Sequence, residues 1–145
     1  MADHDERWIL NHLIELCRDQ ELLLQYVAAH VRDESARALF AEMAADRARF
    51  ANDLLPHAQR LGGGDPAEHT TRGTLQRRWM ELRERLLGHS DDRVITEVER
   101  AEASALAMYE DALNTLLPPA AHDVVERQST LIRLSHERAH AFLMH

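Results

Sequence analysis

The chain has 145 residues, a single cysteine and a formal net charge of −8, which favour one domain, 1–145, with a core that needs neither disulfides nor structural zinc. The acidic balance argues against a nucleic-acid partner bound through a basic surface. No apolar run approaches the roughly 20 residues that span a bilayer, and the start MADHDER lacks the apolar stretch of a signal peptide, so we expect a cytoplasmic protein with no membrane partner.

The first predicted helix runs from about Asp5 to Val31. Alanine, leucine, glutamate and arginine dominate the chain and no long segment alternates apolar with polar residues, so the fold class is all-α. Cys17 is interpreted as a small buried hydrophobe of this helix rather than a reactive thiol. One face of the helix carries Leu10, Ile14, Cys17, Glu21, Leu24, Ala28 and Val31. Glu21 interrupts that apolar face.

A second helix follows Asp33, a good N-cap, and ends at the GGGDP stretch. The connector around residues 32–34 is so short that the two helices must form an antiparallel hairpin. The inward face of the second helix carries Leu39, Phe40, Met43, Arg47, Phe50 and Leu54. Here Arg47 is the charged interruption.

Residues 62–90 form a long connection with a short helix in GTLQRRWMELRERLL between two loops. At about 1.5 Å per helical and about 3.3 Å per extended residue, this segment can travel the length of a bundle of about 40 Å. We expect it to cross from one end to the other, with Trp79 packed on the outside.

Two further helices, from about Asp91 to Leu117 and from about Ala121 to the end, form a second hairpin around Pro118. The third helix carries Ile95, Val98, Glu102, Ala105, Tyr109, Ala112 and Leu116 on one face. Glu102 therefore stands where an apolar residue is expected, and a buried carboxylate must be paired, protonated or bound to a metal. Two hairpins joined by one crossover are typical of a ferritin-like four-helix bundle.

The charged residues that interrupt the apolar faces are expected at one height along the two hairpins. With the turns centred near Asp33 and Pro118, Glu21 lies level with residues near 45, and Glu102 lies level with residues near 135. All are near mid-helix, so we expect Glu21, Arg47 and Glu102 to point inward in one polar layer.

The blocks LNHLIELCRDQE, ALFAEMAADRARFANDL, LQRRWMEL, VERAEASALAMYEDAL and VVERQ resemble those of a bacterial ferritin-like family, domain of unknown function 2383. The wider ferritin-like superfamily implies a di-iron or di-manganese centre with one Glu on each of two helices and Glu-x-x-His on the other two. By this resemblance Glu21 and Glu102 correspond to the single carboxylates, Glu42 to the second-helix glutamate and His136 to the fourth-helix histidine.

The sequence departs from that pattern at two positions. The second-helix histidine would fall at Ala45, and the fourth-helix glutamate would fall at Arg133. A reduced site that holds iron or manganese through Glu21, Glu42, Glu102 and His136 is one interpretation. Two further sets of possible metal ligands match this site less well. Glu99 shares a face with Glu102 but is interpreted as a solvated flank, and Glu137 with His140 has the Glu-x-x-His spacing but lies away from the level of Glu102.

The competing interpretation is a buried ion-pair network without metal. Its members would be Glu21, Glu42 and Glu102, neutralised by Arg47 and Arg133, with hydrogen bonds from Gln128, Ser135, His136 and Tyr109. No catalytic residue is identified, because the chain has no glycine-framed serine and no P-loop, and Cys17 has no histidine beside it on its helix.

The expected function is therefore that of a non-enzymatic, stress-associated or accessory protein, where the stress association is implied by the resemblance. The alternatives are an iron- or manganese-binding carboxylate protein and a helical protein-interaction module. A homo-oligomer is left open, and the sequence names no protein partner.

Overall fold

The part of the chain that the structure describes is helical. The computed structural model describes residues 6–62, 77, 80–81, 83–86 and 88–143. Its long helices are α1 (Glu6–His30), α2 (Glu34–Arg60), α5 (Asp91–Leu113) and α6 (Pro119–Ala141). No strand occurs in these residues, which confirms the all-α prediction for them. None of the described helices combines the length and apolar character that crossing a membrane requires.

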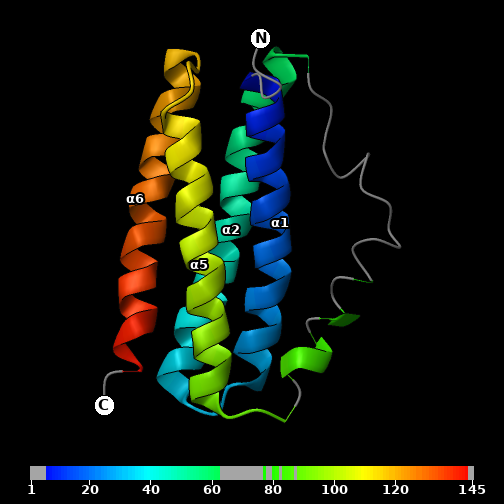
Figure 1. Cartoon of the computed structure of the whole chain (residues 1–145), viewed down its shortest axis with the longest axis vertical. Coiled ribbons are helices and arrows are strands. Elements are labelled where there is room, and N and C mark those ends of the chain that lie inside the picture. The colour runs from blue at the N-terminus through cyan, green and yellow to red at the C-terminus, as the bar shows by residue number, and fades with distance from the viewer. Residues whose placement is uncertain (1–5, 63–76, 78–79, 82, 87, 144–145) are drawn as a thin grey trace.

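The four long helices stand side by side with their axes close to parallel (Figure 1). α1 packs against α2 and α5, and α6 packs against α5 and α2. The two remaining pairs, α1 with α6 and α2 with α5, therefore lie on the diagonals of the arrangement.

The first hairpin begins and ends with recognisable caps. The Asp33 carboxylate accepts a hydrogen bond of 2.8 Å from the backbone N–H of Ala36, which confirms Asp33 as the N-cap of α2. Gly62 follows α2 with a φ of 85°, a left-handed conformation that glycine adopts without steric cost. Its N–H donates to the carbonyl of Gln59 at 3.0 Å and so satisfies one of the carbonyls at the end of the helix.

The start of α5 is held at the connector between α1 and α2. Asp91 accepts hydrogen bonds from the backbone N–H groups of Arg32 and Asp33, each at 3.0 Å at the closest. Gly62 lies at the other end, where a Cβ on it would be 3.9 Å from Nη1 of Arg7 near the start of α1. Residues 63–90 therefore connect opposite ends of the helices, and α2 and α5 run in the same direction, which excludes a simple up-down-up-down order.

Within that connection, residues 83–86 are helical and Leu86 is buried. The prediction that Trp79 packs on the outside falls outside the described residues.

The second hairpin differs from the prediction at its turn. α5 ends at Leu113 rather than near Leu117, and the N–H of Asn114 donates back to the carbonyl of Glu110 at 3.1 Å. Leu117 precedes Pro118, and a residue before proline avoids helical dihedral angles. α6 begins at Pro119, two residues before the predicted Ala121, because proline is well suited to the first turn of a helix.

Buried positions follow one another at alternating intervals of three and four residues, the pattern of helices that pack knobs into holes. In α1 they include Leu10, Leu13, Cys17, Gln20, Leu24 and Val27, and in α5 Ile95, Val98, Glu102, Ala105, Tyr109 and Ala112. The buried apolar residues form two clusters, one reaching Cys17 and Ala105 and the other reaching Leu23 and Val98. Polar side chains occupy the level between them.

Candidate functional site

Each long helix contributes one polar residue to the level between the two apolar clusters. They are Gln20 from α1, Arg47 from α2, Glu102 from α5 and Ser135 from α6, and all four are buried. We call these four residues the polar layer. Each occupies a position of the three-and-four spacing, whose other positions carry apolar side chains except for Gln128 of α6.

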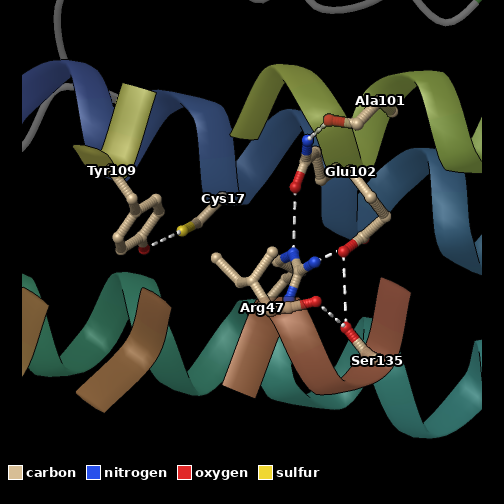
Figure 2. A network of polar contacts seen from close by, with 8 residues as sticks. Cys17, Arg47, Ala101, Glu102, Tyr109 and Ser135 are labelled. Carbon is tan, nitrogen blue, oxygen red and sulfur yellow. Dashed lines mark hydrogen bonds and ion pairs between the residues drawn. The ribbon is translucent and has the colours of Figure 1, made fainter. Parts of the chain in front are cut away.

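An ion pair between Arg47 and Glu102 forms the centre of the polar layer (Figure 2). Nη2 of Arg47 donates to Oε1 of Glu102, and each side chain is only 1% exposed. The pair joins α2 to α5 across a diagonal. Because both charges are removed from water, neither is tolerable here without the other.

Gln20 and Ser135 complete the hydrogen bonding around this pair. Nε of Arg47 donates to Oε1 of Gln20 at 2.9 Å, and Nε2 of Gln20 donates to the carbonyl of Ala101 at 2.8 Å. The Ser135 hydroxyl lies 2.9 Å from the carbonyl of Ile132 and 3.3 Å from Oε2 of Glu102, so its one proton serves either acceptor. Both carboxylate oxygens of Glu102 are thus in contact with a donor, as buried polar groups require.

Burial raises the pKa of Glu102 above its ordinary value, since removal from water disfavours the charged carboxylate. The Arg47 charge, the hydrogen bonds from Arg47 and Ser135, and the charge of His136 oppose that rise. Burial is the larger influence on this pKa, and Arg47 is the main group that opposes it.

A second buried polar group lies beside the polar layer, on the Tyr109 side. The Tyr109 hydroxyl donates to Oε1 of Gln128 at 2.7 Å, and Nε2 of Gln128 donates to the carbonyl of Phe50 at 3.2 Å. Sγ of Cys17 lies 3.2 Å from the same hydroxyl (Figure 2). Burial raises the pKa of Cys17 to about 11 and that of Tyr109 well above 10, so both groups are neutral near pH 7 and act as hydrogen-bonding partners.

The structure does not bring the four predicted metal ligands together. Glu102 is in the polar layer, but Glu42 is exposed and pairs with Arg138 of α6, with oxygen to nitrogen distances of 3.1 and 3.3 Å. The guanidinium of Arg138 lowers the pKa of Glu42 through these hydrogen bonds and through its charge. His136 is half-buried, and no described residue hydrogen-bonds to its buried Nδ1.

The expectation that Glu21 points into the core was wrong. Glu21 is half-buried, accepts a hydrogen bond of 3.2 Å from Gln25 and lines a surface groove, whereas Gln20 takes the inward position. Between Cys17 and Leu24 both the third and the fourth residue lie near the inward face, so the apolar spacing does not choose between them. The series through Leu13, Gln20 and Val27 and the series through Ile14, Glu21 and Ala28 both alternate intervals of three and four residues. The sequence of α1 therefore carries no signal that separates Gln20 from Glu21, and the packing of the helices selects Gln20.

Other proposed members of the site also lie elsewhere. Arg133 is exposed and takes no part in the polar layer, because its neighbours Ile132 and Ser135 face inward instead. Glu99 is half-buried rather than a solvated flank, and its Oε1 contacts Nδ1 of His140 on α6. Glu137 is exposed.

The donor set of the polar layer does not fit a dinuclear iron or manganese centre. Of its four side chains only Glu102 supplies a carboxylate, and one of its oxygens already accepts from a guanidinium. The positive charge of Arg47 repels a cation at this level. Among the described residues no group of three or more His, Cys, Asp or Glu side chains is arranged to hold a metal ion.

Comparison with known proteins gives a family but no activity. Residues 6–115 match the model of a family described as a domain of unknown function, DUF2383. A search of curated proteins finds no match to this chain.

Proposed function

Because the chain belongs to the DUF2383 family, a family defined without an activity, we propose a function from its geometry: a non-enzymatic accessory protein built as a ferritin-like four-helix bundle. In this proposal the Arg47–Glu102 pair takes the place that a metal centre has in ferritin-like enzymes. The protein would then belong with stress-associated accessory proteins of the cell interior, as its resemblance to ferritin-like sequences implies.

The position of the Arg47 guanidinium is the observation that carries the proposal. It bonds to Gln20 of α1 and Glu102 of α5 at the level where carboxylates of four helices would otherwise converge. The Arg47 guanidinium donates to protein acceptors and balances the charge of Glu102, so this level needs no second cation. In this proposal the polar layer has a structural role, and the protein acts through its surfaces.

We assign the ion pair a role in fixing helix register. A purely apolar core of repeated leucine, alanine and valine allows helices to shift by a turn at modest cost, whereas a shifted Arg47 would lose both Gln20 and Glu102. One buried polar position is known to select register in helical assemblies in this way.

Metal dependence tests the proposal. Protein purified without a histidine tag and stripped with a chelator should melt at the same temperature with and without added iron(II) or manganese(II) under anaerobic conditions, because a ligand that binds only the folded state must raise the melting temperature. A near-stoichiometric bound metal whose stabilising effect disappears in Glu102→Gln would overturn the proposal in favour of an iron- or manganese-binding protein.

A further inference from the structure

A shallow groove of about 450 Å³ runs along the outer side of α1 and α2. It is lined by Glu21, Gln25, Ala28, Ala29, Arg37, Ala41, Ala44 and Ala45. The alanines keep its floor apolar and low, so a second pair of helices can approach this side of the molecule closely.

The groove carries an unpaired charge of each sign. Glu21 forms no ion pair with any described residue, and its hydrogen-bond partner is the neutral Gln25. Arg37 bonds through Nε and Nη2 to the carbonyl of Val31, so its positive charge has no carboxylate partner among the described residues.

The two charges lie at equal distances from the middle of the groove. Because Gln20 bonds to Arg47 and the helices are antiparallel, Gln25 of α1 lies about level with Ala41 of α2. Glu21 is four residues before Gln25, and Arg37 is four residues before Ala41. Since the helices run in opposite directions, the charges lie about 6 Å to either side of this level.

We propose that the α1–α2 grooves of two copies pack face to face in a symmetric dimer. A two-fold axis that crosses the helices at right angles, at the level of Gln25 and Ala41, places Glu21 of each copy beside Arg37 of the other. An axis along the helices would instead place Glu21 against Glu21, so the charges select the first orientation. The long side chains of Gln25 and Arg37 then fill the hollow over the alanines of the other copy.

The next charged positions on the same side also match. Arg18 precedes Glu21 by three residues, and the exposed Glu34 precedes Arg37 by three residues, so each lies on the same helical face as the residue it precedes. The same axis brings Arg18 level with Glu34 of the second copy. Arg32 is near this level too, but it belongs to the exposed connector, where its side chain can point into solvent.

Charge reversal tests this arrangement. Glu21→Arg and Arg37→Glu each place like charges together at both contacts, so either variant alone should stay a monomer. The double variant Glu21→Arg/Arg37→Glu restores opposite charges and should dimerise, and a mixture of the two single variants should form a heterodimer. The parent should approach twice the 16.6 kDa of one chain as concentration rises and then stop, because a two-fold contact closes.

Mass is measured by light scattering and sedimentation velocity from low micromolar to near-millimolar concentration, and circular dichroism verifies folding. Ala41→Arg fills the middle of the groove and sets two positive charges against each other across the axis, so it should also stay a monomer. This variant and Glu21→Arg keep the bond from Arg37 to Val31, and they decide the question if Arg37→Glu unfolds.

Matched controls carry the same kinds of substitution outside the groove. Glu110→Arg and Arg133→Glu reverse exposed charges on α5 and α6, and Ala103→Arg replaces an exposed alanine of α5. All three should dimerise as the parent does. A parent that is monomeric throughout or grows beyond two copies, a folded Glu21→Arg or Ala41→Arg that dimerises like the parent, or a folded double variant that stays monomeric would overturn the proposal.

Discussion

Arg47 and Glu102 form a buried ion pair between α2 and α5, two helices that lie on a diagonal and share few other contacts. Apolar side chains hold the neighbouring helix pairs together. The ion pair adds a direct contact between two helices that are not neighbours.

Replacing Arg47 with methionine should destabilise the protein by about 3 to 5 kcal/mol at neutral pH, because it leaves Glu102 buried without its partner. The change also removes the charge and the hydrogen bond that hold the pKa of Glu102 down. The pKa in the folded state then lies further above the unfolded-state value of 4.5, so the deficit should shrink as pH falls toward that value. Chemical denaturation between acid and neutral pH measures both effects. A loss that stays constant with pH would contradict the pairing.

The double variant Arg47→Met/Glu102→Leu should recover most of what the single substitution loses. Apolar side chains of similar volume need no partner, and buried ion pairs replaced in this way are often neutral or stabilising by about 1 to 4 kcal/mol. A double-mutant cycle with the single variants measures the coupling. Additive losses would show that the two side chains do not act as a pair.

Glu102→Gln should remove one pH-dependent part of the stability. Burial raises the folded-state pKa of Glu102, so its contribution is fully present below the unfolded-state pKa and is lost as pH rises through the folded-state value. The free energy of unfolding of the parent, relative to that of Glu102→Gln, should therefore fall as pH rises above about 4.5. Equal slopes for the two proteins would show that the folded-state pKa is unshifted.

Glu42 should show the opposite dependence. Its pKa is lowered by Arg138, so its contribution is present above the unfolded-state pKa and is lost as pH falls through the folded-state value. Because the two side chains are more than half exposed, Glu42→Gln should cost at most about 1 kcal/mol, and added salt should reduce that cost. This variant is the surface control for Arg47→Met. A loss as large as that of the buried pair would mean that Glu42 has a further partner.

Cys17 should resist alkylation in the native protein near neutral pH. Its pKa of about 11 leaves little thiolate, and the side chain is buried against Tyr109. Iodoacetamide labelling followed by mass spectrometry should be slow until denaturant is added and then as fast as for an ordinary cysteine. Rapid labelling of the folded protein would contradict the burial of this thiol.

The sequence by itself determined the four long helices and which charged residues enter the core of α2 and α5. The N-cap at Asp33, the prolines at 118 and 119 and the apolar spacing are local signals that act within a few residues. Arg47 and Glu102 occupy the positions that the three-and-four spacing of α2 and α5 assigns to the inward face, although the small apolar residues Ala48 and Ala101 stand beside them, and both are buried as that spacing predicts.

Only the tertiary structure decided which polar residue of α1 enters the polar layer. It also decided which polar groups form hydrogen bonds and ion pairs with one another. Gln20 and Glu21 differ by one helical position, and the choice between them depends on how α1 packs against α2 and α5 together. Glu42 and Arg133 lie on the sides of their helices, where a rotation of a few tens of degrees separates core from solvent. Helix rotation is set by the summed packing of all four helices, which no single segment encodes, and so the partners of Glu102 became known only once the helices were placed.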